Sequence, residues 1–313
     1  MTAASNPVDV IYVAASRSDA RFTRICVASI RYFYPEVPVE LIAGGPLQPG
    51  LVEELQRHWN VGIANLPAGD YGWGFIKLEP LFLPPGKRFL VLDSDTVIAG
   101  PVLDWVAKYD DAFIVVDEIQ TQEAVKSIYF DWTKATKNGI TLREPDFVFN
   151  SGQWFGRSGI IKREDFAGLV QFGSPTKLVD PTVFKNGEQG VLNFVLNDKA
   201  RTGALSVTRV PLMHWPGFGM NGLNAKMVAA KVAPPVVVHW AGMKKARLSA
   251  MVGSDLLTFF EKFYYQRIPG GEAVRLYAGI RHALSHWLNE IRIRVRLRMK
   301  MIRGVFVKES IGA

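Results

Sequence analysis

Short apolar runs alternate with amphipathic stretches along the first 120 residues of the chain. Runs rich in β-branched residues predict buried strands, and apolar residues that recur every three or four positions predict helices. The predicted strands are residues 8–14, 39–43, 88–93 and 113–116, and the predicted helices are residues 20–34, 51–58, 75–83 and 102–108. Because strands and helices alternate, we expect an α/β fold with a doubly wound, mostly parallel sheet flanked by helices.

The pattern continues less regularly after residue 120. Residues 147–155 and 236–240 predict two further strands, and residues 190–196 predict a helix. No internal repeat or low-complexity segment interrupts the sequence. We therefore expect residues 1–250 to form one domain and residues 251–313 to form a helical, basic region. Helical spacing in that region is followed by Val274, Tyr277, Ile280, Leu284 and Leu288.

The predicted strand 88–93 delivers a pair of carboxylates, Asp93 and Asp95. Open α/β sheets bind ligands at the carboxyl ends of their strands. Carboxylate oxygens are hard ligands suited to Mg²⁺ or Mn²⁺, and such ions commonly join protein carboxylates to the phosphates of a substrate. The pair predicts a metal and phosphate site, although a strand-end aspartate can also simply cap a turn or the next helix.

Composition narrows the class of protein. The chain has 313 residues, of which 48% are hydrophobic, enough for a sizeable core. Its one cysteine, Cys26, is expected to be a small buried thiol on a helix, so a disulfide framework is excluded and a reducing compartment is favoured. No signal-peptide pattern and no apolar run near about 18 residues is present, so we expect a cytoplasmic protein.

The positive charge is concentrated in one segment. The whole chain has a net charge of +8, and residues 291–308 contain seven Lys and Arg but no acid. The rest is nearly balanced, which argues against a nucleic-acid groove in the body. Apolar and basic residues alternate in residues 291–301, so this tail is either a strand or a helix whose cationic side chains snorkel while its aliphatic ones enter lipid. We favour contact with an anionic membrane, at its inner face, over a merely solvated basic surface.

Four separated motifs accompany the aspartate pair. They are Lys77-Leu78, the segment 146–152 (Asp-Phe-Val-Phe-Asn-Ser-Gly), the segment 186–193 (Asn-Gly-Glu-Gln-Gly-Val-Leu-Asn) and the segment 238–245 (Val-His-Trp-Ala-Gly-Met-Lys-Lys). Their order and spacing resemble the family 8 retaining glycosyltransferases, which include glycogenin and the bacterial lipooligosaccharide galactosyltransferases. The likeness covers most of residues 8–247 and implies the GT-A fold.

The resemblance also implies a role for each matching position. Asp93, Asp95 and His239 match the protein ligands of a Mn²⁺ (or Mg²⁺) ion that holds the diphosphate of a nucleotide sugar. Gly242 and Lys245 match residues that contact the diphosphate. Lys77, Asn150 and Ser151 match positions near the donor sugar, and Glu188-Gln189 matches an Asp-Gln pair beside the anomeric carbon. Ala14 and Ser94 complete the expected donor-binding set.

The expected reaction is transfer of a hexose from a nucleoside diphosphate sugar, most simply UDP-hexose, to a saccharide or glycolipid acceptor with retention. Such chemistry would serve polysaccharide or lipopolysaccharide biosynthesis. Three departures bear on the donor: Glu188 replaces the family's Asp, Ala246-Arg247 replaces Pro-Trp, and the segment 14–17 (Ala-Ala-Ser-Arg) lacks the acid that some members use near the base.

Several alternatives stay open at this point. The Asp93-Ser-Asp95-Thr-Val sequence also matches the nucleophile motif of haloacid dehalogenase-like phosphatases, although no second acidic cluster follows it. A catalytically silent, membrane-bound scaffold of the same shape is conceivable. His239 follows three valines and could be a core residue, and segment 150–152 could be an ordinary turn. His282 and His286 are expected on a solvated helix face, and Trp215 is the aromatic residue that we expect beside an acceptor.

Overall fold

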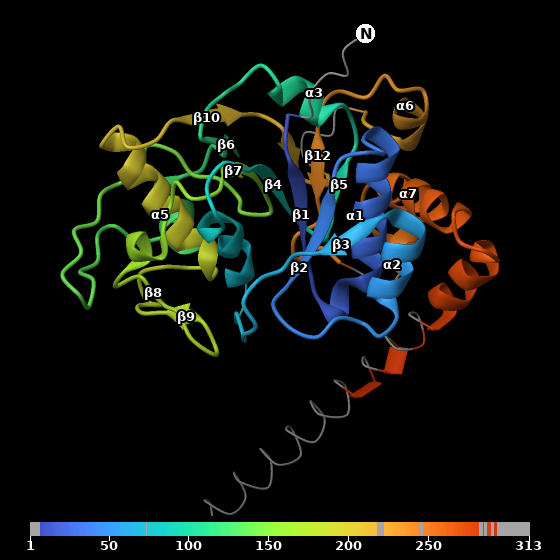
Figure 1. Cartoon of the computed structure of the whole chain (residues 1–313), viewed down its shortest axis with the longest axis horizontal. Helices are drawn as coiled ribbons and strands as arrows, with labels where there is room; N and C mark the ends of the chain where they lie inside the picture. Colours follow the sequence, from blue (N-terminus) through green and yellow to red (C-terminus); the bar gives the residue numbers. More distant parts are fainter. Residues whose placement is uncertain are drawn as a thin grey trace, which may run out of the picture.

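The structure is a computed structural model that describes residues 7–72, 74–217, 222–244 and 247–281, together with residues 284, 287, 288, 291 and 292. Its centre is a seven-stranded sheet with the order β10-β6-β7-β4-β1-β2-β3 (Figure 1). The strands are β1 (Val10–Ala15), β2 (Val39–Ala43), β3 (Val61–Ile63), β4 (Arg88–Asp93), β6 (Phe113–Val116), β7 (Gln153–Arg157) and β10 (Val207–Val210). All neighbouring pairs are parallel except those that β7 makes with β4 and β6. The expected α/β fold with a mostly parallel sheet is confirmed.

Successive residues of the central strands enter two different cores, because side chains alternate across a sheet. In β1, Ile11 and Val13 join the core on one face, and Tyr12 joins the core on the other. Both faces are buried, so these strands are almost uniformly apolar rather than alternating with polar residues.

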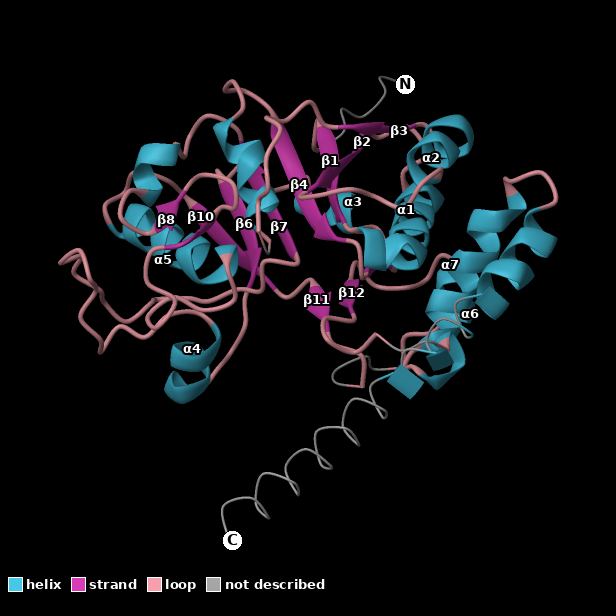
Figure 2. Ribbon diagram, turned by 90° about the horizontal axis from the view of Figure 1, so that it is seen from below, coloured by secondary structure: helices cyan, strands magenta, loops and turns pink. Residues whose placement is uncertain are grey.

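Helices cover the two faces unequally (Figure 2). The first core includes residues of α1 (Ala20–Phe33), α2 (Leu51–Trp59), α3 (Val102–Val106), α6 (Ala225–Ala229) and α7 (Ser254–Gln266). The second includes residues of η2 (Phe75–Phe82), α4 (Gln122–Ile128), η3 (Arg163–Phe166) and α5 (Glu188–Arg201). The short 3-10 helices η1 (Arg17–Asp19) and η4 (Leu248–Ala250) lie in loops. Every helix and strand predicted in the first 120 residues is present, with ends within a few residues of the prediction, although η2 is a 3-10 helix. The short strands at residues 61–63 and 96–98 were not predicted.

The segment predicted as strand 147–155 is extended only in part, since β7 begins at Gln153. Residues 147–149 contribute to the core, but their backbone groups form hydrogen bonds with side chains of helix α5 instead of with a strand. Asn193 Nδ2 of α5 donates to the carbonyl of Phe149, and its Oδ1 accepts from the Phe149 N–H. Asn197 makes the same two bonds with Phe147. These two side-chain amides replace a neighbouring strand, so the prediction of one long strand was wrong here.

A second sheet has the order β11-β12-β5, formed by β11 (Met213–His214), β12 (Val237–His239) and β5 (Thr96–Ile98). Strand β12 is antiparallel to β5, and His239 lies opposite Thr96. A third pair, β8 (Val170–Gln171) with β9 (Lys177–Leu178), lies apart from the central sheet. The β5–β12 pairing brings the histidine beside the aspartate pair across a long stretch of sequence.

Helix α7 packs on α1. Tyr32 makes edge-to-face contacts with Phe259, Phe260 and Phe263 of α7, and Trp59 stacks on Tyr264 at a centroid distance of 4.9 Å. Residues 271–281 continue as a further helix beside α7. No helix in the described part of the chain is both long and apolar enough to cross a bilayer.

Candidate functional site

The two aspartates occupy the turn between β4 and β5. Asp93 ends β4, and its N–H donates to the Gly152 carbonyl at 2.8 Å, while the N–H of Ser94 donates to the Ala14 carbonyl of β1 at 3.2 Å. Because β7 runs antiparallel to β4, its start lies beside the end of β4. The turn 150–152 and the aspartate pair therefore meet at one edge of the sheet.

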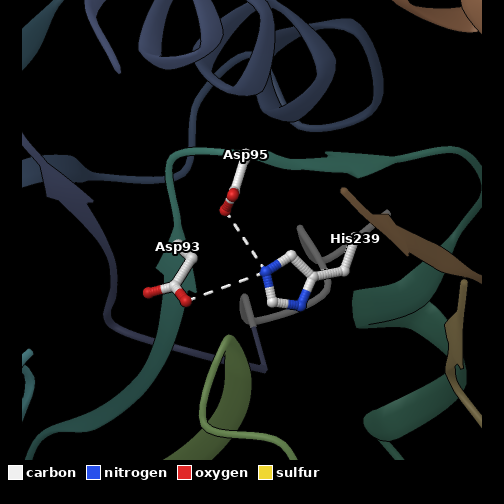
Figure 3. Close-up of side chains that lie close together, drawn as sticks. All are labelled: Asp93, Asp95 and His239. Carbon is white, nitrogen blue, oxygen red and sulfur yellow. Dashed lines mark ion pairs between the residues drawn. The ribbon is translucent and has the colours of Figure 1, made fainter. Parts of the chain in front are cut away.

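His239 completes a compact cluster with the two carboxylates (Figure 3). Its Nε2 lies 3.2 Å from Asp95 Oδ1 and 3.8 Å from Asp93 Oδ2. The imidazole is buried, and neither ring nitrogen has a hydrogen-bond partner among the described residues. A buried polar nitrogen without a hydrogen bond is costly, so this arrangement fits a metal ligand better than a satisfied core histidine. Two carboxylates and one imidazole suit Mn²⁺ or Mg²⁺.

The imidazole of His239 is held between two neighbours. The Trp215 indole stacks on it with a centroid distance of 5.3 Å, and a Cβ added at Gly152 would collide with the ring. Trp215 Nε1 in turn donates to Glu118 Oε1 at 3.2 Å, and Glu118 also accepts from the Tyr129 hydroxyl. The ring is thus flanked by the Trp215 indole and the backbone of Gly152, and Glu118 anchors the indole in turn.

Lys77 lies at the centre of a buried charge cluster. Its Nζ is 2.9 Å from Asp93 Oδ1 and 2.6 Å from Glu188 Oε1, and it donates to the Ser151 carbonyl and hydroxyl at 3.2 and 3.1 Å. Burial alone would lower the pKa of Lys77, but Asp93 and Glu188 outweigh it and raise the pKa above its usual range. The ammonium group therefore stays charged inside the protein.

Glu188, the residue that departs from the family pattern, is fully engaged. Its Oε1 accepts from the Ser151 hydroxyl at 2.8 Å in addition to pairing with Lys77. Its carboxylate lies against the backbone of Gly74, where any Cβ would overlap it. Gly74 also has a φ of 82°, a conformation that few other residues adopt. The longer side chain of Glu188 is therefore accommodated by the glycine that precedes η2.

The neighbouring amides are fixed as well. Gln189 Oε1 accepts from the N–H of Ser151 at 3.1 Å, and Asn150 Oδ1 accepts from the N–H of Gly152 at 2.8 Å. Gln189 continues the series formed by Asn193 and Asn197, one turn apart along α5. A single helix face thereby determines the path of residues 147–151.

Lys244 approaches the cluster from the opposite side. Its Nζ lies 2.9 Å from Asp19 Oδ1 and 3.1 Å from Asp95 Oδ2. Burial on its own would raise the pKa of Asp95, but the nearby His239 and Lys244 hold that pKa well below its usual range. Neither Lys244 nor Asp19 was singled out from the sequence. The doubled lysine at 244–245 was the available signal for the first of them.

The aspartate pair, His239, Lys77, Glu188 and Lys244 open into one cavity of about 900 Å³. It is lined by eleven of the twelve residues predicted for the site, namely Ala14, Lys77, Asp93, Ser94, Asp95, Asn150, Ser151, Glu188, Gln189, His239 and Gly242. The twelfth, Lys245, lies outside the described residues, as do Trp73, His282, His286 and residues 293–308 of the tail. The structure also places η1, with Arg17 and Asp19, on the cavity wall.

Trp154, Trp215 and Trp240 do not line the cavity. Trp154 and Trp240 are fully buried, and Trp154 stacks on Phe113 inside the core. Trp215 has one face on His239 and is not among the residues lining the cavity. Its observed contact is with the histidine of the cluster.

Comparison with known proteins gives matches in structure alone. No family model matches the sequence, and no curated protein matches it. The galactosyltransferase LgtC, solved in complex with donor and acceptor sugar analogues, matches with a TM-score of 0.53 and 14% identity over 83% of this chain and 96% of LgtC. An active-site mutant of LgtC gives 0.52 and 14% over 80% and 94%.

The bifunctional glycosyltransferase WbbM, solved without ligand, matches with a TM-score of 0.51 and 15% identity over 84% of this chain. The chain spans 50% of the length of WbbM. The shared architecture confirms what the sequence resemblance predicted: this chain has the GT-A fold of these glycosyltransferases.

Proposed function

We propose that the protein is a metal-dependent glycosyltransferase that moves a hexose from a nucleoside diphosphate sugar to a saccharide or glycolipid acceptor. The observation that carries the proposal is the convergence of Asp93, Asp95 and His239 at one cavity, within 4.8 Å of one another. The same cavity holds a buried ammonium group and a fixed carboxylate-amide pair. The shared fold with LgtC and WbbM supports this reaction class over others.

Asp93, Asp95 and His239 would hold Mn²⁺ or Mg²⁺. When bound, such a cation neutralises charge that develops on the diphosphate leaving group. Lys244, and Lys245 by its match to the family motif, would add positive charge on the same side. With the cation bound, the site would place positive charge beside the leaving diphosphate.

Glu188 and Gln189 would stabilise the opposite, positively charged sugar. Because Lys77 and Ser151 already engage the Glu188 carboxylate, this side chain is held in place rather than free to swing toward the substrate. Lys77, Asn150 and Ser151 would contact the donor hexose. Attack by the acceptor hydroxyl from the side that the leaving group vacates would retain the anomeric configuration.

The donor is proposed to be UDP-hexose, by resemblance to the family. LgtC, which shares the fold, was solved with donor and acceptor sugar analogues, and this supports sugars on both sides of the reaction. The basic tail, residues 291–308, is proposed to hold the enzyme at the cytoplasmic face of an anionic membrane, where a glycolipid acceptor would lie.

The test is a panel of nucleotide sugars incubated with the protein and Mn²⁺, followed for slow donor hydrolysis in the absence of acceptor. We expect turnover with one or a few donors, and its loss on addition of a chelator. Asp95→Ala should reduce turnover by at least about 100-fold, since it removes a ligand. Asp104→Ala, at an exposed aspartate in the first turn of α3, is the matched control and should retain turnover.

Three outcomes separate the alternatives. Phosphate release from simple esters without a donor would favour the phosphatase, to which the matching structures lend no support. Donor binding without hydrolysis or transfer would favour a silent scaffold. Full activity of Asp95→Ala in the presence of chelator would contradict the metal-dependent transferase.

A further inference from the structure

The helix that follows α7 exposes a row of large apolar side chains. Residues 271–281 are helical, and so are the described residues 284, 287, 288, 291 and 292. The exposed fractions on this segment range from 37% for Ile291 to 67% for Tyr277. We call the following seven residues the apolar stripe: Leu276, Tyr277, Ile280, Leu284, Trp287, Leu288 and Ile291.

The stripe lies on one side of its helix. At about 100° per residue, the seven positions fall within an arc of about 120°. Arg275 lies on the opposite side and pairs with Glu261 of α7 and with Glu272. The helix therefore contacts α7 through the side that carries Arg275, and its apolar side is exposed to solvent. The helix lies at the edge of the molecule (Figure 1).

Other exposed apolar residues do not form such a surface. Ile63, Ile119, Ile160, Val232 and Val252 are exposed but come from separate loops and strand ends. Single exposed apolar side chains are ordinary, whereas a contiguous row marks an interaction surface. The stripe is therefore the surface on which a partner is expected.

We propose that the apolar stripe is the face by which this protein enters the interfacial region of an anionic bilayer, with the helix lying in the membrane plane. Charge selects this partner over a second copy of the chain. Arg292 and the six further basic residues up to Lys308 follow the stripe directly, with no acid among them. Two copies packed stripe to stripe would gain no attraction from these charges, and in a parallel arrangement the charges would repel, whereas an anionic surface would attract them.

The stripe deepens the membrane contact proposed for the tail, because the two parts supply different forces. The tail supplies a salt-sensitive electrostatic attraction, and the stripe supplies burial of apolar area that salt does not screen. Amphipathic helices with basic flanks bind membranes by this combination. The arrangement is independent of which sugar the cavity binds.

The test is co-sedimentation of the full chain with vesicles of phosphatidylcholine containing about one quarter phosphatidylglycerol, in about 0.1 M salt. The stripe variant carries Ile280→Gln, Leu284→Gln and Trp287→Gln, and should lose at least about tenfold in vesicle partitioning. The control variant carries Ile63→Gln, Val232→Gln and Val252→Gln, and should partition as the unsubstituted protein does. A tail variant with Arg292→Gln, Arg294→Gln and Arg296→Gln measures how much the positive charge of the tail contributes to vesicle binding.

The outcomes are distinct. Equal partitioning of the stripe variant and the unsubstituted protein would overturn the inference, and loss of binding in the tail variant alone would leave only the electrostatic proposal standing. A vesicle-free dimer that the stripe variant dissociates would assign the stripe to a second copy instead. Absence of vesicle binding by the unsubstituted protein would overturn both membrane proposals. Donor hydrolysis without vesicles should be unchanged in the stripe variant, so failure here is distinguishable from failure of the transferase proposal.

Discussion

At the scale of single residues, the contact between Gly152 and His239 decides where the imidazole points. Gly152→Ala places a methyl group where the ring now lies, so the ring must move away from the aspartates. We expect the affinity for Mn²⁺ alone to fall by about 10- to 100-fold, the effect typical of losing ligand orientation. Titration of the metal by electron paramagnetic resonance measures it.

The control for this substitution is Gly62→Ala in β3, where the added methyl group would make only ordinary van der Waals contact. Unchanged metal affinity in Gly152→Ala would show that the histidine does not ligate the ion. Trp215→Phe should retain most of the affinity because a ring still stacks on His239.

Lys77 allows a second prediction, on stability. Lys77→Met leaves Glu188 buried beside a neutral group, and we expect the free energy of unfolding to fall by about 3–5 kcal/mol. Lys226→Met on exposed α6 should change it by less than about 0.5 kcal/mol. Urea denaturation measures both.

The double variant Lys77→Met with Glu188→Met should be less destabilised than Lys77→Met alone, because it removes the orphaned carboxylate. Additive losses in the double variant would contradict the assigned pairing.

Residues of the candidate site could be predicted from the sequence where they belong to a recognisable motif. The aspartate pair was chosen by residue type and spacing and His239 by resemblance to a family motif, and the structure brings the three side chains together. Lys244 and Gly74 were not chosen, because their importance depends on distances across the fold: Lys244 reaches Asp95, and Gly74 makes room for Glu188. A glycine beside a carboxylate has no local sequence signature.

At the scale of elements, the amide series on α5 can be tested directly. Asn193→Leu keeps a similar volume but leaves the Phe149 N–H and carbonyl without their partners. Each of the two buried unpaired groups costs about 1–3 kcal/mol, so we expect a loss of about 2–6 kcal/mol in unfolding free energy and a lower turnover rate. Asn138→Leu, at an exposed position, is the control. Chemical denaturation and donor hydrolysis give the two readouts, and wild-type values in both would contradict the role of the series.

The amide series also explains why one predicted strand was wrong while others were correct. Strands 39–43 and 113–116 were predicted with the bounds that the structure has, because short, mostly apolar and buried runs give a clear signal. Residues 147–149 are equally apolar, yet their backbone bonds go to Asn193 and Asn197. The hydrophobicity of a segment indicates that it is buried, but it does not indicate which groups form hydrogen bonds with its backbone.

At the scale of the whole molecule, Cys26 offers a probe of global unfolding. The thiol is fully buried, and burial raises its pKa to about 12. Since only the thiolate reacts, about 10⁻⁴ of this group is ionised at about pH 8 in the native state. We expect labelling by a thiol reagent to be at least about 1000-fold slower in native buffer than in concentrated guanidinium, and to accelerate in parallel with unfolding. Rapid labelling of the native protein would contradict the buried position.

The fold of the molecule was predicted from the alternation of strands and helices, and its GT-A type from the order of the motifs. The positive charge of the tail was visible in the sequence, but the apolar stripe beside it depends on exposure. Leu276 and Leu284 would look the same in the sequence if they faced α7. Their exposure to solvent is known only from the way in which the rest of the chain packs.

The pairing of His239 with Thr96 has a consequence for biogenesis. Both aspartates leave the ribosome while the strand that carries the imidazole is still unsynthesised, because chains emerge from the N-terminal side first. A nascent chain can fold its first βα units and expose two acids, yet it cannot assemble the three-ligand cluster. Binding of the proposed ion by that cluster would therefore have to wait until β12 has joined β5, after translation of most of the polypeptide.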